Sequence, residues 1–402
     1  MVIGVVCEYN PFHNGHLYQL EAAREALGPG ATIVCSMSGD FVQRGEAAVY
    51  SKFARAEAAC RCGADLVVEL PLPWCLSSAE GFARGAVGML AALGAERICF
   101  GSESGDTKAL NALADTLLEG DFIEAVKQRL SADPALSFAA ARQQEAEVRR
   151  GTAAGCLGKP NDILAVEYLK AIRTLDLDME PLVVPRRGAA HDSPVEDRGF
   201  LSASALRERL RSGASIAGFV PPEAEAVFRR EREHGRELSG PDALETALLS
   251  RLLALDEGDF SALPDAADGL GTRVYRAVRR CGSFSEIVAE ATTKRYAAAR
   301  VRRLLLCACL GVKAGMAEGT PPYARILAAS ERGRGHLRAL GKDGGFPLLT
   351  KPAAVKELPK NCETLFSLGA AAHDLYVLGY EGTENRRPGE DWRRGPVVLS
   401  RD

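Results

Sequence analysis

The strongest constraint on the fold is a series of short apolar runs that alternate with helical patterns in the first half of the chain. Apolar runs without polar interruptions are typical of strands buried on both faces, as in a parallel sheet covered by helices. The helical pattern after the first run places leucines on one side and stops at Gly28-Pro29-Gly30. The pattern predicts strands at residues 3–7, 32–37, 66–70, 97–100 and 182–185.

This alternation predicts an α/β fold with a Rossmann-like, doubly wound parallel sheet. Such folds bind their ligands at the carboxyl ends of the strands. Residues that directly follow a strand are therefore the first candidates for binding and catalysis.

The pattern changes near residue 220, and helical periodicity dominates the second half. We expect a sheet domain over residues 1–220 and a mainly α-helical C-terminal domain over residues 221–402. The polar stretch 106–158 is expected to be a helical excursion from the sheet, and the tail after Glu381 to be poorly ordered. Helices of the second domain are expected at 243–255, 273–280, 293–310, 323–340 and 362–375.

The composition of the 402 residues, 47% hydrophobic and 26% charged, is typical of a soluble globular protein. The formal net charge of −3 provides no global positive field, so binding of a nucleic acid would require a local basic surface. The sequence begins without a signal-peptide pattern and contains no apolar stretch of about 18 residues, so we expect no membrane contact. The scattered cysteines lack the spacing of zinc ligands, and we expect reduced thiols, a cytoplasmic location and no metal site.

The segment Glu8-Tyr9-Asn10-Pro11-Phe12-His13-Asn14-Gly15-His16 lies where the first strand ends and the first helix begins. The unpaired N–H groups and the positive dipole end of a helix start favour a polyphosphate ligand, and Gly15 allows its close approach. Asn14 is placed to cap the helix. His13 and His16 can both face the ligand, where donation to the α- and β-phosphates would stabilise charge as pyrophosphate leaves.

A surface turn and a core contact are the alternative interpretation of the two histidines. Two of only six histidines flank a glycine at a strand-to-helix turn, however, and this favours a functional site. The segment predicts an ATP-dependent enzyme that transfers an adenylyl group.

The H-x-G-H pattern at the end of the first strand resembles the signature of the nucleotidyltransferase superfamily. Class I aminoacyl-tRNA synthetases have a similar signature. The segment Phe200-Leu201-Ser202-Ala203-Ser204-Ala205-Leu206-Arg207 resembles the superfamily's late I-S-S-T-x-I-R motif. There, hydroxyls and backbone amides at a helix start hold the β- and γ-phosphates, and the arginine adds charge. Ser202 also fits a simple helix N-cap.

Further blocks are similar to one family, the tRNA(Met) cytidine acetate ligases, and follow one another along nearly the whole chain. They lie at residues 5–20, 37–46, 68–71, 100–103, 160–165, 186–192, 293–296, 302–305 and 323–327.

The resemblance implies a two-step reaction. Acetate and ATP give acetyl-adenylate and pyrophosphate, and the wobble cytidine of elongator tRNA(Met) then takes the acetyl group to become N4-acetylcytidine. No protein nucleophile is needed, because acetate already carries the negative charge, so positioning and phosphate stabilisation would supply most of the acceleration. Mg²⁺ is expected with ATP, without a dedicated metal site, and no protein partner is inferred.

The resemblance also implies which residues contact ATP. Gly101 would admit the nucleotide at a strand end, Asn161 would read the adenine edge or the ribose, and Arg186 follows a strand. The block Gly188-Ala189-Ala190-His191-Asp192 is shorter than the family's usual G-x-G-Y-H-D, which leaves Arg187 as an alternative to Arg186. The predicted ATP-binding residues are Cys7, Glu8, Tyr9, Asn10, Pro11, Phe12, His13, Asn14, Gly15, His16, Leu17, Tyr18, Gln19, Leu20, Gly101, Asn161, Arg186, Ser202, Ser204 and Arg207.

The predicted catalytic residues are His13, His16, Asp40 and Arg44. Asp40 and Arg44 lie in the loop after the second strand, where they would orient acetate or the incoming amine. A structural ion pair in the loop explains them equally well. Glu8 would bind a metal ion or cap a helix.

The densest basic run of the helical half is the candidate tRNA-binding surface. Its basic side chains would hold tRNA phosphates, and Tyr296 would stack on a base. A solvated helix face is the alternative interpretation. The predicted tRNA-binding residues are Lys294, Arg295, Arg302 and Arg303, with Arg300 in the same run.

Two other functions explain part of the sequence. A small-molecule adenylyltransferase of the nicotinamide-mononucleotide or phosphopantetheine kind would account for H-x-G-H and the late serine motif, but not for the helical half. A catalytically idle RNA-binding protein on the same fold would account for the basic run, but not for the intact phosphate-binding residues.

Overall fold

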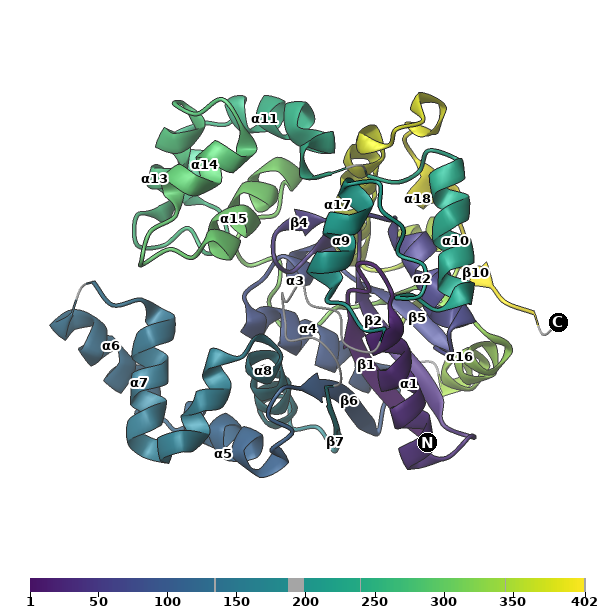
Figure 1. Ribbon diagram of the computed structural model, residues 1–402, viewed down its shortest axis with the longest axis horizontal. Coiled ribbons are helices and arrows are strands. Elements are labelled where there is room, and N and C mark those ends of the chain that lie inside the picture. The colour runs from purple at the N-terminus through teal and green to yellow at the C-terminus, as the bar shows by residue number, and fades with distance from the viewer. Residues whose placement is uncertain (134, 187–198, 239, 344, 401–402) are drawn as a thin grey trace.

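The computed structural model describes residues 1–133, 135–186, 199–238, 240–343 and 345–400, and Figure 1 shows its architecture. In this part of the chain an eight-stranded sheet has the order β10-β8-β5-β2-β1-β6-β7, with β9 paired to β8. Its strands are β1 (Val2–Cys7), β2 (Thr32–Ser38), β5 (Leu66–Leu70), β6 (Arg97–Ser102), β7 (Glu180–Pro185), β8 (Ala324–Ala329), β9 (Leu348–Leu349) and β10 (Val397–Val398). A separate hairpin consists of β3 (Phe41–Val42) and β4 (Glu46–Ala47).

The predicted α/β fold with a parallel sheet is confirmed. β1 pairs in parallel with both β2 and β6, and β2–β5 and β6–β7 are also parallel. From β1 the strand order runs to β2 and β5 on one side and to β6 and β7 on the other. The chain therefore reverses its direction of travel between β1 and β6, which is where such sheets bind ligands.

The predicted helix at 323–340 is wrong in its first part. Ala324–Ala329 forms strand β8, buried along its whole length and antiparallel to β5. The helix α16 begins only at Glu331. Alanine and leucine favour helices, but a fully buried run of this length can also form a strand, and the tertiary pairing with β5 prevails here.

Helices cover both faces of the sheet. On one face Leu90 and Leu169 pack with Ile98 of β6, and on the other Phe53 and Phe228 pack with Ile33 of β2. The covering helices are α1 (Asn14–Leu27), α2 (Lys52–Arg61), α4 (Ala79–Ala92), α8 (Pro160–Thr174), α9 (Ala203–Arg211), α10 (Pro222–Glu233) and α16 (Glu331–Asp343), with the short α3 (Leu72–Cys75) between β5 and α4.

Two groups of helices extend from the sheet (Figure 1). The predicted excursion is an arm of α5 (Thr107–Leu117), α6 (Phe122–Ala132) and α7 (Phe138–Arg150). The second group, the helical body, has its own apolar core and consists of α11 (Glu245–Leu253), α12 (Glu257–Ser261), α13 (Leu270–Val278), α14 (Phe284–Ala291) and α15 (Ala298–Leu310).

After the helical body the chain returns to the sheet through β8, β9 and β10, with α17 (Lys360–Tyr376) and α18 (Glu390–Arg393) between them. The second half is thus mainly helical, as expected, yet it also extends the sheet. The domain boundary near residue 220 stays a prediction. None of the helices in the described ranges is long and apolar enough to span a membrane.

The expectation of a poorly ordered tail is wrong, because the tail carries a buried charge cluster. Asp391 of α18 is fully buried, and its Oδ2 pairs with Lys52 Nζ at 2.6 Å and with Arg325 Nη1 at 2.7 Å. Lys52 Nζ also pairs with Glu69 Oε1 at 2.8 Å. The cluster connects the tail to α2, β5 and β8, which overrides the flexibility that Arg, Gly and Pro residues would otherwise allow.

We predict that Asp391→Ala lowers the free energy of unfolding by about 3–5 kcal/mol, because it leaves two buried cations short of a partner. Chemical denaturation measures this change directly. The matched control is Glu381→Ala, an exposed acidic residue of the same tail, which should change stability by less than about 0.5 kcal/mol. Equal, small effects of both substitutions would show that the cluster does not anchor the tail.

Candidate active site

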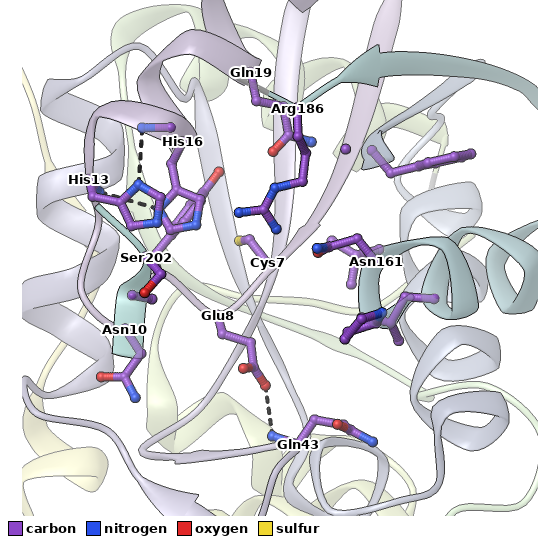
Figure 2. A pocket seen from close by; sticks show the side chains of 18 of the residues that line it. Cys7, Glu8, Asn10, His13, His16, Gln19, Gln43, Asn161, Arg186 and Ser202 are labelled. Atoms are coloured by element: carbon purple, nitrogen blue, oxygen red, sulfur yellow. Dashed lines mark hydrogen bonds between the residues drawn. The ribbon is translucent and has the colours of Figure 1, made fainter. Parts of the chain in front are cut away.

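A cavity of about 400 Å³ opens at the carboxyl ends of β1 and β6, where the strand order reverses. Its wall consists of the turn between β1 and α1, the β3–β4 hairpin, the end of β7 and the starts of α8 and α9. Figure 2 shows side chains that point into it, among them His13, His16, Glu8, Asn161 and Arg186. The cavity therefore lies where this class of fold binds its ligands.

The two histidines of the H-x-G-H turn are held by the backbone of that turn. His13 is the N-cap of α1, and its Nδ1 accepts a hydrogen bond from Gly15 N–H at 3.0 Å. His16 Nδ1 accepts one from His13 N–H at 3.2 Å, and the two rings stack with centroids 3.7 Å apart. Because both Nδ1 atoms are acceptors, each neutral ring carries its proton on Nε2 and donates from there.

Burial keeps both imidazoles neutral. It lowers the pKa of His13 to about 3, and the charges of Arg186 and Arg207 contribute in the same direction. Burial also lowers the pKa of His16 well below its usual value, with further effects of His13 and Arg186. At neutral pH the cavity therefore has two uncharged Nε2–H donors, which suit phosphate oxygens whose charge grows during a reaction.

Asn14 does not cap α1, contrary to the sequence-based prediction, because the His13 imidazole takes that role. The Asn14 side-chain amide instead donates to Gly199 O at 3.0 Å and to Gly218 O at 2.9 Å. Its backbone N–H donates to Phe219 O at 3.0 Å. Asn14 thereby ties the start of α1 to the segments on either side of α9, and so holds two helix starts of the cavity together.

Arg186 and Ser202 add a cation and a hydroxyl to the wall near the histidines. Arg186 follows β7, and an added Cβ on Gly101 would come within 3.4 Å of Arg186 Cγ. The missing side chain of Gly101 therefore makes room for the arginine stem. Ser202 is the N-cap of α9, as its sequence context also suggested, and its hydroxyl lies 3.0 Å from that of Ser204.

Arg207 reaches the same wall from α9. Its Nη1 donates to Asn10 O at 3.0 Å, whereas its buried Nε has no hydrogen-bond partner in the described ranges. Burial lowers the pKa of Arg207, partly offset by Glu46. A buried guanidinium with an unused N–H beside a cavity favours an anionic ligand.

Across the cavity from the histidines lies the amide of Asn161 (Figure 2), and two aromatic rings also line the cavity. Asn161, at the start of α8, donates from Nδ2 to a carboxylate oxygen of Glu103. Since a carboxylate only accepts, this bond fixes the amide orientation and leaves Oδ1 for a ligand donor. Phe100 and Tyr168 line the cavity with ring centroids 5.7 Å apart. An apolar wall with aromatic rings and one hydrogen-bond acceptor suits an adenine base and its exocyclic amine.

Glu8 points into the cavity from the end of β1 (Figure 2). Its Oε1 accepts hydrogen bonds from Gln43 N–H at 2.7 Å and from the Ser38 hydroxyl at 3.4 Å. Burial raises the pKa of Glu8, against the opposing effects of the Gln43 bond and of Arg55. The hairpin residue Gln43 also lines the cavity. It was not among the predicted site residues, and the only signal for it in the sequence was its place in the block at 37–46.

Asp40 does not line the cavity, which argues against its predicted role in orienting a substrate. Its Oδ1 accepts from Lys52 N–H and its Oδ2 pairs with His373 Nδ1, both at 2.8 Å. Burial alone would lower the pKa of His373, but Asp40 and Asp391 raise it to about 10, so the pair is ionic. The structural ion pair is thus the better interpretation, with His373 as the partner. Arg44 does line the cavity.

Arg55 is a supporting residue that the sequence did not single out. Its fully buried guanidinium donates to the carbonyls of Glu8, Ser38 and Gly39, and its Nε donates to Tyr50 O at 2.9 Å. Arg55 therefore fixes the ends of β1 and β2 beside the cavity. A charged residue within a helical pattern is normally read as exposed, and nothing in the local pattern distinguished this one.

The predicted ATP-binding residues divide into two groups. Pro11, Phe12, Asn14, Leu17 and Leu20 do not line the cavity and belong to the turn and α1 behind it. Arg187 and the block 188–192 lie outside the described residues. Those that line the cavity are Cys7, Glu8, Tyr9, Asn10, His13, Gly15, His16, Tyr18, Gln19, Gly101, Asn161, Arg186, Ser202, Ser204 and Arg207.

The predicted tRNA-binding run is largely engaged in contacts within the protein. Arg295 pairs with Asp268 at 3.5 Å, and Tyr296 is buried, with its hydroxyl bonded to the Asp268 carbonyl. The side chain of Arg303 is only 12% exposed and pairs with Asp265 at 3.5 Å. Arg303 is therefore largely buried, whereas the Arg295 side chain stays 53% exposed beside its partner.

Arg302 connects the helical body to the cavity hairpin. Its Nε donates to Arg44 O at 3.1 Å and lies 3.8 Å from Glu46 Oε1. An added Cβ on Gly45 would come within 2.7 Å of Arg302 Cβ, so α15 and the hairpin are in direct contact. Lys294 is exposed, so its side chain is accessible for the predicted contact with tRNA phosphates.

Comparison with known proteins assigns the family. Residues 1–391 match the HIGH nucleotidyl transferase family. The tRNA(Met) cytidine acetate ligase of Kosmotoga olearia is 36% identical over 425 aligned residues, which cover 99% of either protein. This chain belongs to the tRNA(Met) cytidine acetate ligase family. Another member, from Syntrophotalea carbinolica, is 37% identical over 87% of this chain and 84% of that protein.

Solved structures of the acetate ligase family agree with the fold. TmcAL of Thermotoga maritima in its apo form has a TM-score of 0.91 and 32% identity, over 99% of both chains. The same enzyme bound with α-thio ATP has a TM-score of 0.89 and 31% identity, again over 99% of both chains.

We predict that His16→Ala lowers acetate-dependent ATP–pyrophosphate exchange by about 10²–10³-fold, the usual cost of losing one donor to a developing charge. Affinity for tRNA should stay nearly unchanged, because the ring is inside the cavity. The matched control is His234→Ala, an exposed histidine at the end of α10, which should exchange at the wild-type rate. Comparable activity of His16→Ala would contradict the role given to this ring.

Proposed function

We propose that the protein is an ATP-dependent ligase that activates acetate as acetyl-adenylate and acetylates the wobble cytidine of elongator tRNA(Met). The observation that carries the chemistry is the cluster of phosphate-directed donors in one cavity, His13, His16, Arg186 and Arg207. The full-length relatives named tRNA(Met) cytidine acetate ligase support the substrates, and the α-thio ATP complex of TmcAL supports ATP.

The two walls of the cavity suggest how ATP lies. Adenine would sit against Phe100 and Tyr168, with its exocyclic amine donating to Asn161 Oδ1. The triphosphate would then lie along the starts of α1 and α9, where the Nε2–H donors and the positive ends of the helix dipoles are found. Ser202, Ser204 and Arg207 fit the β- and γ-phosphates, and the histidines fit the α- and β-phosphates.

In the first step an acetate oxygen attacks the α-phosphorus, and the bond from the α-phosphorus to the bridging oxygen breaks. Pyrophosphate takes the electron pair, and the imidazole and guanidinium donors stabilise it. In the second step the cytidine N4 attacks the acetyl carbonyl carbon, AMP leaves, and N4 loses a proton. The cavity supplies positioning for both steps without a covalent enzyme intermediate.

Acetate and the tRNA cytidine fit the side of the cavity formed by the hairpin. Arg44 lines this side and offers a cation to the acetate carboxylate. The hairpin contacts α15 through Gly45 and Arg302, so the helical body borders the entrance used by the second substrate. We assign tRNA binding to residues 221–402 on this basis.

Mg²⁺ would enter with the ATP phosphates. The described residues contain no group of three metal-ligating side chains, and the carboxylates that line the cavity are Glu8 and Glu46. A metal ion held mainly by phosphate and water fits such a site. We also propose a cytoplasmic location, supported by eleven cysteines that form no disulfide.

The decisive assay follows both half-reactions with wild-type protein. ATP–pyrophosphate exchange should require acetate, and radiolabelled acetate should enter elongator tRNA(Met) only when ATP is present. Transcripts in which the wobble cytidine is replaced by uridine serve as the matched control and should take up no label. Exchange driven by nicotinamide mononucleotide instead of acetate would overturn the proposal, as would tRNA binding without consumption of ATP.

A further inference from the structure

A second hollow, of about 220 Å³, lies in the helical body away from the cavity. Three arginines of α13 and its end, Arg273, Arg276 and Arg280, line it together with Gly269, Thr272, Ala277 and Glu290. The arginines are three and four residues apart, so they share one face of the helix. We call this feature the α13 groove.

Two of these arginines have no side-chain partner among the described residues. Arg276 and Arg280 are exposed and make no hydrogen bond or ion pair within the described ranges. Arg273, in contrast, is fixed, because its guanidinium donates to Ala291 O at 2.9 Å and to Glu290 O at 2.6 Å. A fixed guanidinium beside two unpaired ones gives the groove a net positive charge even with the Glu290 carboxylate present.

The neighbouring arginines, in contrast, are mostly engaged in contacts within the protein. Arg279, on another face of α13, donates to Leu253 O and Leu255 O and lies over the Tyr275 ring. Arg303 is buried and Arg302 is bonded to the cavity hairpin, as described above. The basic run that stands out in the sequence is therefore mostly occupied, whereas the α13 groove is open.

The α13 groove is connected to the cavity through packed helices. Val274 and Ala277 of α13 pack in the same apolar core as Ile287 of α14 and Leu304 of α15. The helix α15 contacts the hairpin that lines the cavity. The groove and the cavity are therefore linked through elements in direct contact.

We infer that the α13 groove binds the sugar-phosphate backbone of the tRNA substrate, with Arg276 and Arg280 contacting neighbouring phosphates. The inference rests on the proposed function and adds a binding site to it. The net charge of −3 means that a polyanion needs such a local surface. Guanidinium groups match phosphate geometry, and neither arginine has to break an internal contact first.

The test measures tRNA affinity at several salt concentrations for the variant Arg276→Ala/Arg280→Ala. Loss of two phosphate contacts should weaken binding about tenfold or more and reduce the slope of log K against log salt by about two. Acetate-dependent ATP–pyrophosphate exchange, measured without tRNA, should be unchanged, since neither residue reaches the cavity. Arg276→Lys/Arg280→Lys should retain most of the salt slope, because the charge is kept.

The matched control is Arg334→Ala/Arg338→Ala. These two exposed arginines are also four residues apart, but lie on α16, which packs against β2 and β8 on the sheet. The control should bind tRNA like the wild type. Wild-type affinity and slope in the α13 variant, or equal weakening in both variants, would overturn the inference. A wild-type protein that binds no tRNA would instead contradict the proposed function itself.

Discussion

The site depends on two hydrogen bonds in the turn between β1 and α1, in which imidazole Nδ1 atoms accept backbone N–H groups. These bonds satisfy helix-start amides that a serine or aspartate would otherwise cap. They also determine the tautomer, so that the two stacked rings present Nε2–H to the cavity. Burial removes their positive charge, and the arginines supply charge separately. The same contacts thus hold the turn in its conformation and orient the two Nε2–H donors toward the cavity.

Around this turn, buried charged side chains hold together segments that are distant in sequence. Arg55 joins the ends of β1 and β2, and Asp391 joins the tail to α2 and β8. The Asp40–His373 pair links the hairpin loop to α17. Buried pairs of this kind contribute little net stability compared with apolar packing, but a missing partner is costly, so they favour a single arrangement. That arrangement packs segments from the last third of the chain against α2, β5 and the hairpin loop, while the cavity itself is lined by residues from the first two thirds.

Much of the fold and of the cavity wall could be predicted, because both leave local patterns. Continuous apolar runs indicated the parallel strands, and residues at or directly after the carboxyl ends of strands, such as Gly101, Glu8 and Arg186, do line the cavity. Long-range pairing left no such pattern. The sequence of Ala324–Ala329 has a helical pattern, and only its pairing with β5 makes it a strand. From the sequence, the charged residues Arg55 and Asp391 would be expected on the surface, but both are buried. The tRNA-binding role of the basic run stays a prediction, since composition does not reveal which of its arginines already have partners within the protein.

The most direct test of this account is the protonation state of the two histidines. NMR of ¹⁵N-histidine-labelled protein distinguishes the Nε2–H tautomer, the Nδ1–H tautomer and the imidazolium, and His13→Gln and His16→Gln variants assign the signals. Both rings should be neutral Nε2–H tautomers that do not titrate between pH 8 and pH 5, because burial lowers the pKa of His13 to about 3 and lowers the pKa of His16 well below its usual value. An imidazolium at pH 7, or a proton on Nδ1 of either ring, would contradict this account.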